Sequence, residues 1–259
     1  MKLAVCGCSW SSRDANHPNH EFGQFIADYF DAEYHNLAVP ACTNFGIRLQ
    51  LDHAIDVLNA DFVIINATTP TRIDFKINNK ERYAHENGWY NVDYTLLMDS
   101  IGSVFQDDLD TSFDENHIKE RLSKVMNKDT HSLLKHYFMH FYDPDIERHK
   151  QYFILQNGLD KLLKNNIKFI FSPNTFEWAE GMTMSNSLLE YNTEPFKWQI
   201  PQENLLEKGI AEYLNVCDDI YGSWENSPGP KYSHHLPLES HMAYAIDSIN
   251  HIKQNILDK

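Results

Sequence analysis

Three short apolar runs constrain the fold of this chain more than any other feature. They are Leu3–Cys8, Asp61–Asn66 and Ile167–Ser172, and the second contains the unbroken sequence Phe-Val-Ile-Ile. Apolar runs of this length, without alternating polar residues, are typical of strands that are covered on both faces, as in a parallel sheet. Successive parallel strands need a crossover connection, which is usually a helix. The runs therefore predict an α/β protein.

The sequence between these runs supplies the expected crossover helices. Helical periodicity covers Glu21–Phe30, Thr43–Leu58, Ser132–Tyr142, Asp143–Asn165, Glu203–Leu214 and Glu239–Leu257. A further short strand is predicted at Tyr34–Val39, and a weaker one near Asn215–Ile220. Strands that alternate with helices in this way predict a parallel sheet covered by helices on both faces.

Residues 73–129 interrupt the alternation, because they mix aromatic, acidic and Asn-rich sequence without a sustained period. We predict a largely helical insertion there, with short helices at about 94–105 and 115–127, that serves as a lid or a partner surface. The whole chain of 259 residues suits a single domain that contains this insertion.

Composition excludes several classes of function. A formal net charge of −15 disfavours a nucleic-acid partner, since phosphates are met by clustered Lys and Arg. The four cysteines form no CxxC pair, which indicates reduced thiols in a cytoplasmic protein. We also find no signal peptide and no apolar run approaching the roughly 18 residues that a membrane span needs.

Nothing in the sequence indicates a metal or a cofactor. No Gly-x-Gly-x-x-Gly or Walker-type loop follows the first strand, so phosphate binding lacks its motif. His17 and His20 are separated by Pro18, which disfavours the helical spacing that would aim both at one metal ion. We therefore expect neither a metal nor a cofactor.

Two residues at opposite ends of the chain indicate chemistry. Ser9 follows the first predicted strand in Gly7-Cys8-Ser9, and His235 stands shortly before the last helix. A serine and a histidine in these places are a candidate nucleophile and its base. The alternatives are that Ser9 is a turn or cap residue, and that His234 or His241 replaces His235.

The order of these segments resembles the SGNH, or GDSL-like, hydrolase superfamily. Its four sequence blocks are a Gly-Asp-Ser type turn after the first strand, a glycine turn after the second, a Gly-x-Asn-Asp turn after the third, and an Asp-x-x-His near the C-terminus. The resemblance implies a three-layer, flavodoxin-like sandwich with a parallel five-stranded sheet in the order 2-1-3-4-5.

The first and last blocks carry the match. Gly7-Cys8-Ser9-Trp10 looks like the Gly-Cys-Ser-aromatic variant of one branch of the family, and His235-Leu-Pro-Leu-Glu-Ser-His241 looks like its ending before the final helix. By this resemblance Ser9 is the nucleophile and His235 the general base.

The other blocks depart from the family pattern. Tyr232 stands where the orienting aspartate is expected, and Pro70 stands where the oxyanion asparagine is expected. Asp218, Asp219 and Glu225 precede the base, but no spacing rule selects one of them as a replacement acid.

Other residues of the middle blocks are candidate substrate-binding groups. Asn36-Leu-Ala-Val-Pro-Ala-Cys-Thr-Asn44 resembles the second block with Ala41 at its glycine, so the N–H groups of Ser9 and Ala41 are candidate oxyanion donors. Asn44 is either a further donor or a helix cap. Thr69 is a donor or a cap, and Arg72 either neutralises an anion or pairs with an acid such as Asp74.

The sequence thus predicts a serine hydrolase that cleaves small esters or transfers acyl groups, using a Ser-His dyad or a non-standard triad. The alternative is a catalytically impaired protein of the same fold that serves as a binding or structural module. The replacements at Tyr232 and Pro70 favour the non-catalytic alternative, whereas Ser9 and His235 favour a catalytic function. The oligomeric state is not indicated.

Overall fold

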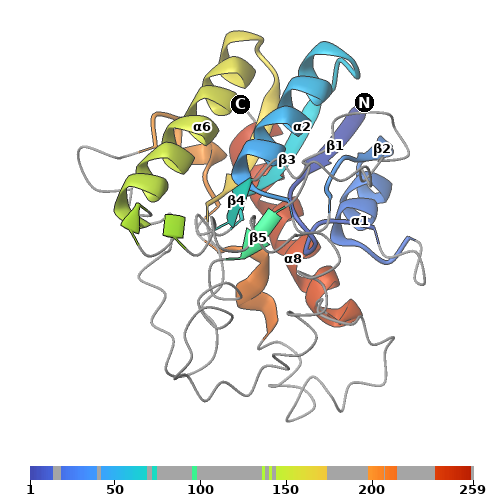
Figure 1. Cartoon of the computed structure of the whole chain (residues 1–259). Coiled ribbons are helices and arrows are strands. Elements are labelled where there is room, and N and C mark those ends of the chain that lie inside the picture. The colour runs from blue at the N-terminus through green and yellow to red at the C-terminus, as the bar shows by residue number, and fades with distance from the viewer. Residues whose placement is uncertain are drawn as a thin grey trace.

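The structure of the protein is a computed structural model, shown in Figure 1. It describes residues 1–13, 19–39, 42–68, 72–74, 95–97, 136–137, 140–141, 144–173, 198–206, 208–214 and 237–257.

Four parallel strands form the central sheet, in the order β2-β1-β3-β6. Their bounds are β1 Lys2–Cys6, β2 Glu33–Asn36, β3 Phe62–Asn66 and β6 Lys168–Ser172. β3 is buried along its whole length, which explains its unbroken apolar sequence. The α/β class and the parallel sheet are confirmed, whereas the fifth strand and the full order 2-1-3-4-5 stay predictions.

Helices cover both faces of this sheet. They are α1 Phe22–Tyr29, α2 Asn44–Asp56, α6 Pro144–Lys164 and α8 Leu238–Ile252. α1 packs against α8, and α2 packs against α6, as Figure 1 shows. Consecutive side chains of a strand point to opposite faces, so Val5 approaches α1 whereas Cys6 faces α2. The described elements therefore form three layers.

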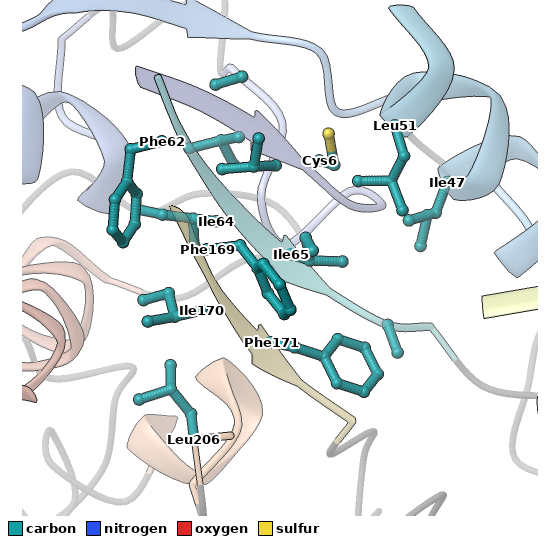
Figure 2. Close-up of a cluster of buried hydrophobic side chains, with 14 of the residues drawn as sticks. Cys6, Ile47, Leu51, Phe62, Ile64, Ile65, Phe169, Ile170, Phe171 and Leu206 are labelled. Atoms are coloured by element: carbon teal, nitrogen blue, oxygen red, sulfur yellow. The ribbon is translucent and has the colours of Figure 1, made fainter. Parts of the chain in front are cut away.

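The core lies on both faces of β3 and β6. Figure 2 shows Ile47 and Leu51 of α2 on the side of Cys6. These two α2 side chains are fully buried. Phe171 lies on the α6 side, where its ring packs edge-on against Trp198 at 4.8 Å between centroids. Burial of this apolar surface is the main favourable term in folding the sheet.

The helices that lead into strands share one kind of ending. Asp31 after α1, Asn59 after α2 and Asn166 after α6 all have positive φ, between 50° and 55°. Short Asx side chains tolerate this left-handed conformation better than most residues, and it is a common way to end a helix. Each of these residues lets the chain reverse and enter the next strand.

Several predicted elements differ from the structure. Residues 95–97 lie within a predicted helix, but they form the strand β5 (Thr95–Leu97), which pairs antiparallel with β4 (Arg72–Asp74). This prediction was wrong because strand pairing with a distant segment leaves no trace in local periodicity. The rest of the predicted insertion, 73–129, lies outside the described residues apart from 73–74.

The predicted helix Glu203–Leu214 is also wrong. Two short 3₁₀ turns, Gln202–Asn204 and Ile210–Leu214, stand in its place. Between them, Leu205 forms an isolated parallel bridge to Phe171, and the N–H of Leu206 donates to the Phe171 carbonyl at 2.9 Å. Because Leu205 and Leu206 pair with β6 in this way, they cannot also form the hydrogen bonds of a continuous helix. The predicted fifth strand near 215–220 lies outside the described residues.

Among the described residues, no helix is both long enough and apolar enough to cross a membrane.

Candidate active site

The segment that carries Ser9 is fixed where it leaves β1. The N–H of Gly7 donates to Gln50 Oε1 at 2.7 Å, and Gln50 Nε2 donates back to the Gly7 carbonyl at 3.0 Å. Gln50 lies on α2 and is fully buried. A buried amide that is paired twice in this way fixes the backbone, since either bond would be costly to lose.

Two further bonds form the turn itself. The N–H of Ser11 donates to the Cys8 carbonyl at 2.9 Å, and Ser12 Oγ donates to the Ser9 carbonyl at 2.9 Å. Ser9 is partly exposed, whereas Cys8 and Ser11 are buried. Ser9 and Ser12 are therefore the partly exposed serines of this turn, and Ser9 stands closer to the carboxyl end of the interior strand β1.

Ser11 has the opposite role from Ser9. Its carbonyl accepts a bond from Asn36 Nδ2 at 2.9 Å, and its hydroxyl oxygen accepts one from Asn66 Nδ2 at 3.0 Å. Asn36 ends β2 and Asn66 ends β3, the two neighbours of β1. Ser11 thus ties the turn to both adjacent strands and is not available as a nucleophile.

Asn44 holds the segment that follows β3. Its Oδ1 accepts from the N–H of Thr68 at 2.8 Å, and its Nδ2 donates to the Thr68 carbonyl at 2.9 Å. The cap of α2 is Thr43, whose Oγ1 accepts from the N–H of Gly46 at 3.1 Å. Asn44 therefore fixes the residue directly before Thr69, and it is the first residue of α2 rather than its cap.

α8 begins at the same edge of the sheet. His241 Nδ1 accepts from the N–H of Phe22, the first residue of α1, at 3.3 Å. Ser240 Oγ, one residue earlier, donates to the Tyr213 carbonyl at 2.6 Å. Since α1 starts after the carboxyl end of β1, the start of α8 lies at that end too. His241 contributes to the packing of α1 against α8.

The structure describes only part of the predicted site. Ser9 and Asn44 are described in full, and the backbone of Arg72 lies in β4. Ala41, Thr69 and His235 lie outside the described residues, as do Pro70 and Tyr232.

The sequence did not predict the buried polar residues around the turn, chiefly Gln50 and Asn66. Asn66 carried a usable signal, because an asparagine that closes an apolar, fully covered strand needs hydrogen-bond partners. Gln50 looked like one polar position on an amphipathic helix, and nothing in the sequence marked it as buried.

The Cys6 thiol, at the end of β1, is held in its protonated form. Burial raises the pKa of the Cys6 thiol well above its ordinary range, so Cys6 stays protonated and unreactive. Cys6, Cys8 and Cys42 are all buried, and none of these three forms a disulfide. Within the described part of the chain, no three His, Cys, Asp or Glu side chains gather where they could hold a metal ion.

Among the known proteins compared with this chain, similarity was found to solved structures and to no others. No family model and no curated protein matches the chain. An acetyl xylan esterase, AlAXEase, aligns over 99% of this chain and 100% of its own, at 14% identity and a TM-score of 0.46. Esterase EstA from Pseudoalteromonas sp. aligns over 98% of this chain and 97% of its own, at 10% identity and a TM-score of 0.48.

A third similar structure is a putative lipolytic protein of the G-D-S-L family from Desulfitobacterium hafniense. It aligns over 96% of this chain and 98% of its own, at 9% identity and a TM-score of 0.44. These values are too low to assign the present chain a family or an activity.

Proposed function

We propose that this protein is a serine hydrolase that acts on small esters, with Ser9 as nucleophile and His235 as general base. The observation that carries the proposal is the placement of Ser9, which is partly exposed in a turn fixed at the carboxyl end of the interior strand β1. In open parallel α/β sheets, ligands bind at this edge.

Chain connectivity supports His235 as the partner of Ser9. Pro237 precedes the first residue of α8, and α8 begins at the edge of the sheet that carries the Ser9 turn. Two residues of chain span at most about 7 Å, so the backbone of His235 stays within that reach of Pro237. No other histidine of the sequence precedes this helix so closely except His234.

The proposed reaction begins with attack of Ser9 Oγ on the ester carbonyl carbon, while His235 takes the hydroxyl proton. His235 returns this proton to the leaving alkoxide as the carbon–oxygen bond breaks. Water then attacks the acyl-serine, gives a proton to His235, and releases the acid as Ser9 regains its proton. An alcohol in place of water would make the same site an acyl transferase.

Backbone N–H groups of Ser9 and Ala41 are the proposed donors to the oxyanion. Asn44, Thr69 and Arg72 are further candidates for binding the substrate. The Nδ2 group of Asn44 has a second hydrogen besides the one that it donates to Thr68.

A binding or structural role without catalysis is the second candidate. It is favoured by Tyr232 and Pro70, which replace the acid and the oxyanion donor of the resembled family. We further propose a single domain. We also propose a cytoplasmic location, which is supported by Cys6, Cys8 and Cys42, since these three buried thiols form no disulfide.

A fluorophosphonate probe tests the hydrolase proposal, because it reacts covalently with activated serines. We expect the label on Ser9, located by mass spectrometry, and its complete loss in Ser9→Ala. His235→Gln should slow labelling by about 10³-fold or more, as expected for loss of a general base. His35→Gln, at a partly exposed position of β2, should label like the wild type. A wild-type protein that stays unlabelled would favour the non-catalytic candidate.

A further inference from the structure

A row of polar side chains crosses the sheet at its carboxyl edge, on the face covered by α1 and α8. The same face also carries the apolar residues Leu3, Val5 and Ile64. Register places Asn36 beside Val5 and Asn66 beside Ser172. Neighbouring residues of parallel strands share a face, so the asparagines flank the point where the Ser9 turn leaves β1.

Asn66 makes the longest-range contact of this row. Its Nδ2 donates to Ser11 Oγ at 3.0 Å, and its Oδ1 accepts from the Tyr244 hydroxyl at 2.7 Å. Ser11 belongs to the nucleophile turn, and Tyr244 belongs to α8. The amide nitrogen and the amide oxygen of the buried Asn66 side chain therefore join two segments, the Ser9 turn and α8.

The Tyr244 ring is itself held firmly. It packs edge-on against Phe22 at 4.8 Å and against Tyr213 at 5.4 Å between ring centroids. Tyr244 is 1% exposed, and this burial raises the pKa of its hydroxyl far above neutrality. The hydroxyl thus stays protonated, and remains a hydrogen-bond donor, at neutral pH.

We propose that Asn66 is a positioning residue, which sets the distance between the Ser9 turn and the start of α8. This inference rests on the proposed function, because the proposed base His235 precedes the first residue of α8, Leu238, by three positions in the chain. The side chain of Asn66 bonds to one residue in each of these two segments. It acts through Ser11, two residues after Ser9, and through Tyr244 in the second turn of α8.

Catalysis is sensitive to the distance that such a link sets between reacting groups. A displacement of about 1 Å between reacting groups can cost about 100-fold in rate, even when its cause lies away from the chemistry. A merely structural hydrogen bond would instead change the free energy of unfolding and leave the reaction of the folded protein unaltered.

A matched pair of tyrosines separates the two roles. Tyr244→Phe removes the hydroxyl bond to Asn66. Tyr213→Phe removes a hydroxyl bond of the same length, 2.7 Å, from Tyr213 to Asp247 on the same helix. Both variants lose one bond that anchors α8, but only Tyr244→Phe releases the link to the nucleophile turn.

The experiment compares both variants with the wild type in three measurements. Urea unfolding gives stability, p-nitrophenyl acetate hydrolysis gives kcat and KM, and hydrogen exchange follows the amide of Ser11. We expect Tyr244→Phe to lower kcat by about tenfold or more, with KM little changed and faster exchange at Ser11. Tyr213→Phe should keep kcat within about twofold at a similar loss of stability. Asn66→Ala should reproduce the effect of Tyr244→Phe.

Equal kcat values in the two tyrosine variants, or unchanged exchange at Ser11 in Tyr244→Phe, would overturn the positioning role while leaving the hydrolase proposal intact. A wild-type protein that neither hydrolyses the ester nor accepts the fluorophosphonate overturns the hydrolase proposal and the positioning role together.

Discussion

At the scale of single residues, Gly7 shows how tightly the turn is built. A Cβ at this position would lie 2.6 Å from Ser11 Oγ and 2.8 Å from Ser11 Cβ. Ser11 cannot move aside freely, because Asn36 and Asn66 hold it. The absence of a side chain at Gly7 is therefore a requirement of packing around the turn.

Gly7→Ala should destabilise the protein by about 1–3 kcal/mol, the usual cost of forcing an extra methyl group into a packed region. It should also slow fluorophosphonate labelling of the folded protein, because the methyl group displaces the Ser9 turn. Gly158→Ala is the control, since its Cβ would crowd Leu51 and Arg48 at the α2–α6 contact instead. Urea unfolding and labelling rates check both variants; equal labelling of Gly7→Ala and wild type would contradict the crowding argument.

At the scale of elements, an ionic group joins α2 to α6. Asp52 pairs with Arg48 on its own helix and with Lys161 on α6, which also pairs with Asp56. Partial burial alone would raise the pKa of Asp52, but the hydrogen bonds from Arg48 and Lys161 outweigh it and lower that pKa. A carboxyl whose pKa is lowered by folding stabilises the protein above its unfolded pKa, near 3.9.

This stabilisation should be lost as the pH falls through the lowered pKa of Asp52. Asp52→Asn should therefore reduce stability at pH 7, on the order of 1 kcal/mol or less for a partly exposed pair. It should also weaken the loss of stability between about pH 5 and pH 2, the range over which such carboxylates titrate. Urea unfolding at several pH values measures both effects. Asp160→Asn on α6 serves as the control, because the new amide oxygen can still accept the hydrogen bond from Gln156. If the free energy of unfolding changed with pH in the same way in both variants, the assignment to Asp52 would be refuted.

Most of these elements could be predicted from the sequence to within a few residues. Pro144 was expected as the first residue of a helix, and α6 begins there. The periodicity of Thr43–Leu58 likewise predicted α2, although its cap is Thr43 and not Asn44, the candidate cap named from the sequence. Local chemistry decides both features, because a cap or an N-terminal proline acts on backbone groups of its own first turn. The strand at Thr95–Leu97 failed this approach, since its partner lies in β4.

At the scale of the whole molecule, stability depends on the layers that cover β3. Leu51 is fully buried between α2 and the sheet, whereas Phe153 on the outer side of α6 is 61% exposed. Hydrophobicity alone would make the larger Phe153 the more important residue. Its position in the fold reverses that order, because only area removed from water contributes.

Leu51→Ala should cost about 2–5 kcal/mol, the usual range for truncating a buried leucine. Phe153→Ala should stay within about 0.5 kcal/mol of the wild type, as expected for a surface substitution. Urea unfolding of the two variants checks this, and similar losses in both would mean that Phe153 is covered in solution. Neither substitution should alter fluorophosphonate labelling per folded molecule.

The sequence by itself determined the alternation of strands and helices, the buried character of β3, and the choice of Ser9 as candidate nucleophile. These features depend on neighbours within a few residues, whose spacing the chain displays directly. Only the tertiary structure decided that Ser11 is buried while Ser9 is accessible, and that Asn66 joins the turn to α8. Asn66 and Tyr244 stand 178 positions apart, and a hydrogen bond at that separation depends on how the layers pack. Local pattern carries no record of such a bond, although it predicts that a buried asparagine must find partners.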